Sequence, residues 1–375
     1  MQAQIANYPF TTIEPNHGTG FVRIDCIDTF FKVQCNPRTG YCKNHQRFVP
    51  VDLVDVAGLV PGASEGKGLG NKFLDDLRKA DALIHVIDCS GSTNEKGEPV
   101  ALNSYDPAND IKFLETEIDL WFKGVVEKNI LKIARKRFES KSELLQSLSE
   151  IFSGLCVKSF QLEKAINACN LIEKKLFDWT QDDFLAFAIQ LRKQSKPIII
   201  AANKIDLPGA IENLGKLKKQ FPEQIIFGCS ADSELALKKA VNAALIEYLP
   251  GDADFKILKD LSAGQSQALT AIQKNVLEKL SGTGCEKILN AIVFDLLKCI
   301  AIFPAGSNKL VDSEGRILPD CFIMPPGTTA LDFAFSLHSD IGNNFIRAIN
   351  VKTKQLVGKD HKLEHRDAIE IIFNK

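Results

Sequence analysis

The segment Ile198-Ile199-Ile200-Ala201-Ala202-Asn203-Lys204-Ile205-Asp206 decides the fold of this chain. Its first five residues are a short apolar run, which is typical of a strand buried on both faces of a parallel sheet. The polar residues that follow suit a ligand: Asp206 can accept hydrogen bonds from N1 and N2 of guanine, Asn203 can reach another edge, and the stem of Lys204 can pack on the ring. Adenine has no matching pair of donors. The segment therefore predicts an α/β domain that reads guanine, with a polar turn closing a buried strand as the alternative.

A glycine-rich segment, residues 55–70, follows a second apolar run at 48–54. Asp55 at the carboxyl end of a strand can hold Mg²⁺ through water, and the backbone N–H of Gly58 can bond to a terminal phosphate. The glycines allow this loop to order around the phosphate and to relax after hydrolysis. The spacing to a third apolar run at 82–88 favours this interpretation over a flexible surface loop.

A further loop, Gly228-Cys229-Ser230-Ala231, follows a short apolar run at 225–227. If that run is another strand of the same sheet, Ser230 and Ala231 lie where a loop could touch the guanine carbonyl. This loop is a weak signal by itself, but it supports the interpretation of the segments at 198–206 and 55–70.

The order of these segments resembles the Obg-like GTPases, specifically the YchF subfamily (Obg-like ATPases) and its archaeal-type members. The resemblance is carried by residues 7–16, 55–70 and 203–206, and near the C-terminus residues 318–320, 326–330 and His338 resemble a TGS domain. It implies a P-loop NTPase-type parallel sheet followed by a small β-grasp domain. It also implies a GTPase that hydrolyses GTP with Mg²⁺ and acts as a translation- or ribosome-associated switch.

The resemblance assigns further roles around the γ-phosphate. Thr11 and Thr12 lie in the matching segment, where one threonine coordinates Mg²⁺; we favour Thr12 but cannot separate the two. Leu59 stands where many GTPases carry the Gln that orients the attacking water, so we expect slow hydrolysis and name no catalytic residue. The intact Asn-Lys-x-Asp motif favours GTP over ATP, because ATP-hydrolysing members usually depart from it.

The chain departs from the family at its N-terminus. Relatives begin with a strand, a G-x-x-x-x-G-K-[ST] loop and a helix, which need about 25 residues, whereas ten residues precede Thr11. The Gly-Lys pairs at 66–67, 215–216 and 358–359 do not complete the motif. Since this loop holds the β- and γ-phosphates, we expect the chain as given to hold a triphosphate poorly and to be a truncated gene model or fragment. A non-hydrolysing RNA- or ribosome-binding adaptor is the alternative.

We predict three domains. Residues 1–104 and 196–300 form the nucleotide-binding domain, 105–195 an inserted helical arm, and 301–375 the TGS domain. In the arm, apolar residues recur at three- and four-residue steps, as at Ile111, Leu114 and Ile118, which predicts an antiparallel helical arm or short coiled coil; a helix packed on the core is the alternative. Its basic segment, 123–137, is either solvated or in contact with RNA phosphates, as the family's link to ribosomes favours.

The TGS segment is expected to place one helix, at 331–338, between two β-rich stretches. Thr328 or Thr329 can cap this helix, and residues 368–373 form the last strand. No acid–base pair accompanies His338, so we expect that side chain to be structural and the domain to be a binding module.

Composition agrees with a cytoplasmic globular protein. The 375 residues are 45% hydrophobic and 25% charged with a net charge of −1, which gives no support for a bulk polyelectrolyte role. We see neither a signal peptide nor a membrane span.

The ten cysteines are scattered, as expected for free thiols in a reducing compartment. Cys26, Cys35 and Cys42, with His45 nearby, form the one cluster that suggests a metal. Zinc usually takes closely paired ligands such as C-x₂₋₄-C, and these gaps are wider. Archaeal-type relatives often carry cysteines here, but Asp28 stands where one has been lost, so free thiols are favoured over zinc.

Overall fold

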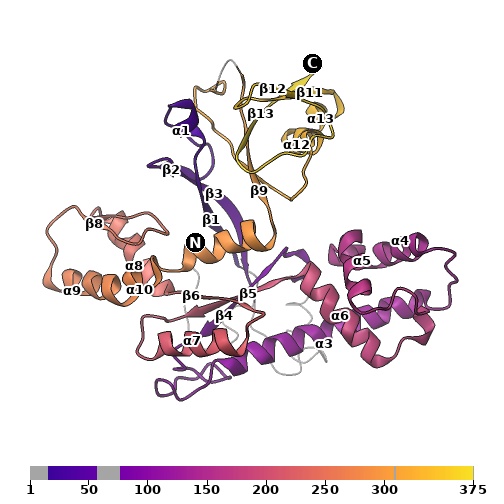
Figure 1. Ribbon diagram of the computed structural model, residues 1–375. Coiled ribbons are helices and arrows are strands. Elements are labelled where there is room, and N and C mark those ends of the chain that lie inside the picture. The colour runs from indigo at the N-terminus through magenta and orange to yellow at the C-terminus, as the bar shows by residue number, and fades with distance from the viewer. Residues whose placement is uncertain (1–15, 57–76, 308–309, 375) are drawn as a thin grey trace. The chain divides into compact units, whose positions relative to one another are not determined.

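The apolar run at 198–202 forms the middle strand of a parallel sheet (Figure 1). The computed structural model describes residues 16–56, 77–307 and 310–374. These residues belong to two units, of which the larger is built on Val54–Cys285 and the smaller combines Gly18–Leu53 with Glu286–Lys375.

The parallel sheet of the larger unit has the order β4-β5-β6, with β4 at Leu83–Asp88, β5 at Ile198–Asn203 and β6 at Ile225–Gly228. All five apolar residues of β5 are buried, because a central strand meets protein on both faces. The helix α7 (Ala210–Gln220) and the first turns of α3 (Ala108–Ile133) pack on this sheet through Leu214, Leu217 and Ile111. The predicted α/β fold with a parallel sheet is confirmed.

Four helices between β4 and β5 form a small bundle. Figure 1 shows α3 beside α6, with α4 and α5 at their far part; α3 and α6 contact each other along their length. A shared core includes Ile118, Phe122, Leu148 and Phe187. The remaining elements of the bundle are α4 (Lys141–Phe152), η2 (Ser153–Leu155), α5 (Ser159–Ala168), η3 (Leu176–Asp178) and α6 (Gln181–Ser195). The shared core also contains Ile198 of β5, and Ile111 of α3 joins the core of the sheet, so the arm packs continuously onto the parallel sheet.

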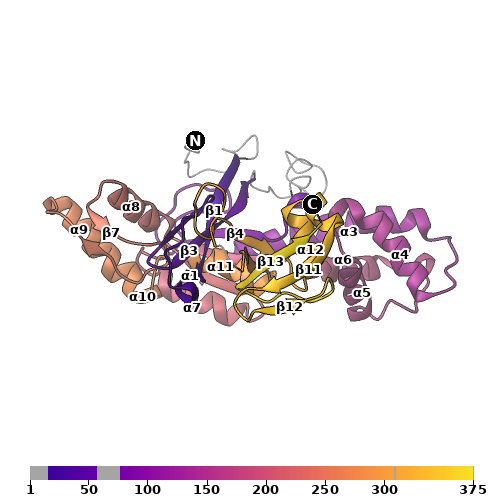
Figure 2. The same cartoon turned by 90° about the horizontal axis from the view of Figure 1, so that it is seen from above.

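A second helical group follows β6, and Figures 1 and 2 both show α8, α9 and α10 gathered together. Its core contains Leu237, Ile246, Tyr248, Leu269 and Leu277. The elements are α8 (Ala231–Asn242), β7 (Ile246–Glu247), β8 (Lys256–Ile257), α9 (Ala263–Ile272), η4 (Gln273–Leu277) and α10 (Glu278–Leu280). The next helices, α11 (Cys285–Asn290) and η5 (Ala291–Leu296), belong to the smaller unit from Glu286 onward.

The smaller unit contains two sheets. One has the order β1-β3-β2, and its elements are β1 (Asn16–Asp25), α1 (Asp28–Phe31), β2 (Tyr41–Lys43) and β3 (Gln46–Asp55). The side chain of Asn290 bonds to both backbone groups of Arg23 on β1: its Oδ1 accepts from the Arg23 N–H at 2.9 Å and its Nδ2 donates to the Arg23 carbonyl at 2.8 Å. The guanidinium of Arg47 on β3 donates to the carbonyls of Leu318 and Pro319 at 3.1 and 3.0 Å.

The other sheet has the order β10-β9-β13-β11-β12, with β9 and β13 parallel and the other pairs antiparallel. Phe333 of α12 packs on its buried face with Ile302 and Ile369, which is the predicted β-grasp layout. Thr329 caps α12, as its Oγ1 accepts from the Asp332 N–H at 3.1 Å. The elements are β9 (Ile300–Pro304), β10 (Phe322–Met324), α12 (Ala330–Leu337), α13 (Ser339–Asn343), β11 (Phe345–Asn350), β12 (Gln355–Val357) and β13 (Asp367–Phe373).

The two units divide the chain differently from the predicted domains, because residues 18–53 and 286–300 pack with the β-grasp sheet. Packing alone does not say which residues bind nucleotide, so the domain boundaries stay a prediction. Among the described helices, none combines the length and the apolar character that crossing a bilayer requires.

Candidate functional site

The carboxyl ends of β4, β5 and β6 bring three polar segments to one edge of the parallel sheet. The strand register pairs Asp88 with Asn203 and Ala202 with Gly228, so the residues that follow each strand emerge side by side. Cys229 continues this register, since its N–H donates to the Ala202 carbonyl at 2.9 Å. Ligands of open parallel sheets bind at such an edge.

Asp206 and Asn203 are both held by the loop after β6. Ser230 donates its hydroxyl to Oδ1 of Asp206 at 2.7 Å, and the backbone N–H of Ala231 donates to Oδ1 of Asn203 at 3.0 Å. The N–H of Ile205 also donates to the Cys229 carbonyl at 3.2 Å. The structure therefore places four predicted site residues together and fixes the orientation of two of their polar side chains.

Lys204 is oriented by the end of β4. Its backbone lies in the left-handed region with φ 61°, and its Nζ donates to Oδ2 of Asp88 at 2.9 Å. Asp88 also accepts from the hydroxyls of Ser90, Ser92 and Thr93 at 2.5, 2.7 and 2.8 Å. This network fixes the lysine stem on the same edge as Asn203.

The Asp88 carboxylate is ionised by its surroundings. Burial would raise its pKa, but the hydrogen bonds from Ser90, Lys204, Ser92 and Thr93 outweigh burial and lower the pKa from 3.8 to about 2. The Asp88 carboxylate is therefore charged across the physiological pH range.

The loop after β6 rests on buried polar partners. Ser230, which is 1% exposed, donates its N–H to the Thr283 carbonyl at 2.9 Å, and the Thr283 hydroxyl donates to Glu234 at 2.7 Å. Tyr248 donates to the same Glu234 oxygen at 2.8 Å. Gly284, with φ +85°, lies so close to β6 that a Cβ would stand 2.1 Å from the Gly228 carbonyl oxygen.

The remaining predicted site residues are those assigned to the metal and the phosphate. Asp55 ends β3 and its side chain is exposed. Gly58, Leu59, Thr11 and Thr12 lie outside the part of the chain that the structure describes.

Asp88 and Thr283 also contribute to this edge, and neither was predicted from the sequence. Asp88 ended a predicted strand in the same way as Asn203 and could have been identified from that position. Thr283 follows Ser230 by 53 positions, and no local pattern in the sequence links them. Both residues support the site by holding Lys204 or the Ser230 loop.

Three family models match the chain. Residues 1–114 match a 50S ribosome-binding GTPase model. Residues 201–306 match the Obg-like GTPase YGR210-like, G4 motif-containing domain, which includes Asn203 to Asp206, and residues 303–373 match the TGS domain.

Relatives match over almost the whole chain. An uncharacterized GTP-binding protein of Methanocaldococcus jannaschii is 43% identical over 99% of this chain and 93% of its own length. An uncharacterized GTP-binding protein of Schizosaccharomyces pombe is 36% identical over 88% of this chain and 82% of its own length. The ribosome-binding ATPase YchF of Bacillus subtilis is 26% identical over 99% and 93%.

Solved structures agree with these relatives. The GTP-binding protein from Pyrococcus horikoshii has 34% identity and a TM-score of 0.75, covering 96% of this chain and 93% of that one. The Schizosaccharomyces pombe YchF GTPase, at 19% identity and a TM-score of 0.53 over 98% and 90% of the two chains, shares the fold. Together with the geometry at the ends of β4, β5 and β6, these matches show that the chain belongs to the Obg-like GTPases, in their YchF branch.

Proposed function

We propose that this protein binds guanine nucleotides at the edge formed by Asn203, Lys204, Asp206, Ser230 and Ala231. The observation that carries the proposal is the state of Asp206. Its carboxylate is half-buried and held by Ser230 through Oδ1, while among the described residues Oδ2 has no hydrogen-bond donor. That oxygen, together with Oδ1, can accept the N1 and N2 donors of guanine.

The same geometry favours GTP over ATP. Adenine offers no pair of donors to a carboxylate, so its binding would leave the charge of Asp206 desolvated without compensation. Two relatives, in Methanocaldococcus jannaschii and Schizosaccharomyces pombe, carry the description GTP-binding, whereas the more distant Bacillus subtilis relative is described as an ATPase.

Mg²⁺ is the cofactor that the proposal includes. Asp55 fits this ion in donor chemistry, because it presents an exposed carboxylate at the end of a strand and Mg²⁺ prefers oxygen ligands, often through water. Bound Mg²⁺ would neutralise charge on the β- and γ-phosphates. Thr11 or Thr12 would complete its ligands, and Gly58 would bond the terminal phosphate.

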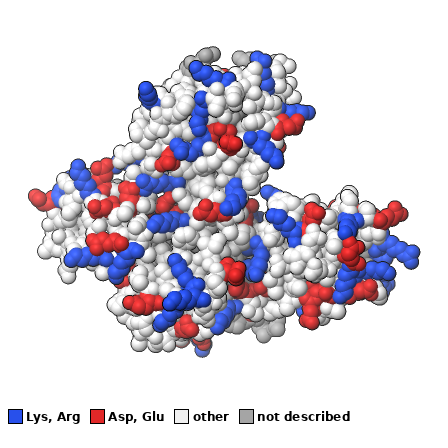
Figure 3. All heavy atoms as spheres, in the orientation of Figure 1, with Lys and Arg blue, Asp and Glu red and all other residues white. Residues whose placement is uncertain are grey.

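We further propose that the nucleotide state controls association with the ribosome, with hydrolysis by attack of water on the γ-phosphate of GTP. The description of the YchF relative as ribosome-binding supports this partner. On the face drawn in Figure 3, Lys and Arg side chains alternate with Asp and Glu over the arm, and Lys136 pairs with Glu143 at 3.4 Å. On this face, ribosome contact is thus expected to use small basic patches of the arm and the TGS domain.

Replacing Asp206 with Asn tests the base assignment. In Asp206→Asn an amide donor replaces one carboxylate acceptor, which mismatches the guanine donors and matches the C2 carbonyl of xanthine. We expect affinity for GMP to fall about 10- to 100-fold, the value of one hydrogen bond to a charged group, and affinity for XMP to rise. Titration calorimetry with GMP, XMP and AMP on the 375-residue chain measures all three.

Asp232→Asn is the matched control, because Asp232 is exposed in the first turn of α8 and undergoes the same change of charge. Its GMP affinity should equal that of the unmodified chain. Equal loss in both variants, or unmodified protein that prefers AMP, would refute the assignment. Comparing GMP with GTP in the same titration tests the phosphate site. Since the 375 residues contain no G-x-x-x-x-G-K-[ST] loop, the two extra phosphates should add little affinity.

A further inference from the structure

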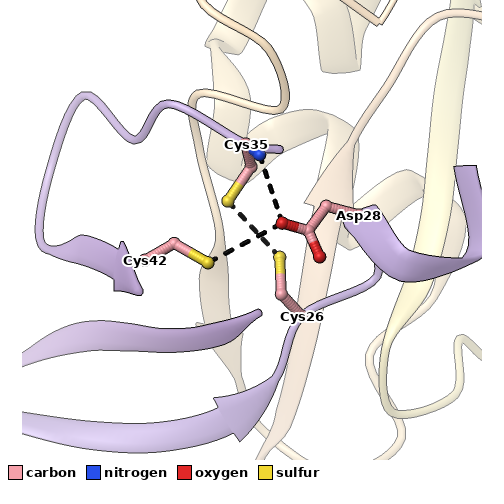
Figure 4. Close-up of side chains that lie close together, drawn as sticks. All are labelled: Cys26, Asp28, Cys35 and Cys42. Atoms are coloured by element: carbon pink, nitrogen blue, oxygen red, sulfur yellow. Dashed lines mark hydrogen bonds between the residues drawn. The ribbon is translucent and has the colours of Figure 1, made fainter. Parts of the chain in front are cut away.

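Four side chains from the segment that connects β1 to β3 point toward a common centre. Cys26 directly follows β1, Asp28 begins α1, Cys35 lies in the loop after that helix, and Cys42 lies on β2. Figure 4 shows the three thiols and the carboxylate pointing toward one another. One ligand atom from each lies within 4.8 Å of all the others, and three of the four residues are buried.

The distances within this cluster are close to those of a tetrahedral metal site. Sγ of Cys26 and Sγ of Cys35 are 3.5 Å apart, and Sγ of Cys42 is 3.8 Å from Oδ2 of Asp28. In a tetrahedral zinc site with Zn–S bonds of about 2.3 Å and Zn–O bonds of about 2.0 Å, neighbouring ligand atoms are about 3.5 to 3.8 Å apart. Every other pair of ligand atoms lies within 4.8 Å, so the four donors could bind zinc after the longest distances shorten by roughly 1 Å.

Asp28 is the fourth donor of the cluster, and the spacing of the cysteines in the sequence did not indicate it. It is 0% exposed, and Nδ1 of His45 lies 3.0 Å from its Oδ1, while the N–H of Cys35 donates to its Oδ2 at 3.1 Å. Outer partners of this kind orient metal-binding carboxylates. A left-handed residue at Lys32 (φ 56°) and two more at Asn44 and His45 (φ 53° and 60°) turn the chain back, so that donors far apart in sequence meet.

The charge around the cluster is also suitable. Three thiolates and a carboxylate around a dication leave a net negative site. Arg47, which is 1% exposed, places Nη1 3.7 Å from Sγ of Cys35 and so supplies a compensating positive charge. A ligand set dominated by sulfur selects Zn²⁺ over hard ions such as Mg²⁺.

A disulfide would explain less of this arrangement. A disulfide between Cys26 and Cys35 would not explain why the thiol of Cys42 and the buried carboxylate of Asp28 point toward the same centre. The connecting segment at 26–45 holds only the four-residue α1 and the three-residue β2 as regular structure, and so short a segment gains most from a metal that ties its loops together.

We propose that Cys26, Asp28, Cys35 and Cys42 form a structural zinc site that ties α1 and β2 to the ends of β1 and β3. This site is separate from the nucleotide site and goes beyond the function proposed above. With three thiolates and one carboxylate it is closed, since all four positions of the tetrahedron are taken by protein.

Metal content of the 375-residue chain tests the site directly. The protein is purified anaerobically with a reductant from zinc-supplemented cells, and zinc is measured by mass spectrometry together with Co²⁺ absorption after exchange. We expect about one zinc per chain and an intense sulfur-to-cobalt charge-transfer band. Cys42→Ser should lose most of the zinc, whereas Cys156→Ser, which removes an exposed thiol of the larger unit, should keep it.

A second variant keeps the test decisive if Cys42→Ser fails to fold. Asp28→Cys should retain zinc and strengthen the charge-transfer band of the Co²⁺ form, because a fourth thiolate replaces the carboxylate. An unchanged band in Asp28→Cys would show that position 28 does not bind the metal and would overturn the proposal. So would metal-free unmodified protein, a Cys26–Cys35 disulfide under these conditions, or equal zinc loss in Cys156→Ser. None of these results depends on nucleotide binding.

Discussion

At the scale of single residues, the sequence predicted polar side chains that the structure brings together, but not the residues that hold them in place. The role of those side chains in reading guanine stays a prediction. Asn203, Lys204 and Asp206 form a contiguous motif, and the structure places Ser230 and Ala231 against them as expected. Asp88 is 116 positions from Lys204 and Thr283 is 53 from Ser230, so these pairings depend on strand register and loop packing. Local sequence does not specify such long-range contacts.

The Asp88 network predicts a pH-dependent stability. The pKa of this carboxyl is lowered to about 2 in the folded chain, below the 3.8 of an unfolded one, so its contribution is present above pH 4 and disappears as pH falls toward 2. Asp88→Asn should therefore be less stable than the unmodified protein by about 2 kcal/mol at pH 7. Urea unfolding of both proteins between pH 7 and pH 2 should show this difference shrinking to near zero. A difference that stays constant with pH would contradict the prediction.

At the scale of elements, runs of apolar residues and cap residues were sufficient to predict β5 and α12. The run at 198–202 is fully buried and Thr329 caps α12 as the sequence suggested. The four donors at Cys26, Asp28, Cys35 and Cys42 were not predicted as a set, because two of the turns that gather them use left-handed non-glycine residues, at Lys32 and at Asn44 and His45, which no local pattern marks.

Because Gly284 approaches β6 closely, the addition of one methyl group at this position should destabilise the protein strongly. Gly284→Ala would combine φ +85° with a Cβ 2.1 Å from a backbone oxygen, so the segment that holds Ser230 must shift. We expect a loss of about 2 kcal/mol or more in unfolding free energy, together with weaker GMP binding.

Gly215→Ala is the control for that substitution. Gly215 is exposed within α7 and has no atom near its Cβ position, so alanine there should raise stability by about 0.5–1 kcal/mol. Chemical denaturation compares the two variants. Similar effects of both changes would show that the approach of Gly284 to β6 carries no special constraint.

At the scale of the whole molecule, the sequence predicted an α/β domain, a helical arm and a β-grasp domain, but not how packing divides the chain. β3 was expected in the nucleotide-binding sheet, yet among the described strands it pairs with β1 and β2. Which strands pair across long sequence separations depends on which sheet edge each strand binds most favourably. A local run of apolar residues does not reveal that preference.

This division predicts that a guanine nucleotide protects one part of the chain selectively. A GMP concentration of about 100 times its Kd would stabilise the unit that binds it by about 2.7 kcal/mol. Hydrogen–deuterium exchange should then slow in β5, β6 and α8, while β9 to β13 exchange as before. AMP at the same concentration is the control. Uniform slowing across both units, or equal slowing with AMP, would contradict the assignment.

The amide of Asn290 has a consequence for how this protein behaves at high concentration. Among the described strands, β1 is the edge strand of its sheet, and the backbone N–H and C=O groups of an edge strand can template the addition of another chain. By bonding to both backbone groups of Arg23, the amide acts as a one-residue imitation of a neighbouring strand. Another polypeptide strand therefore cannot form an uninterrupted series of hydrogen bonds along β1. The Asn290 amide thus protects this edge strand against self-association.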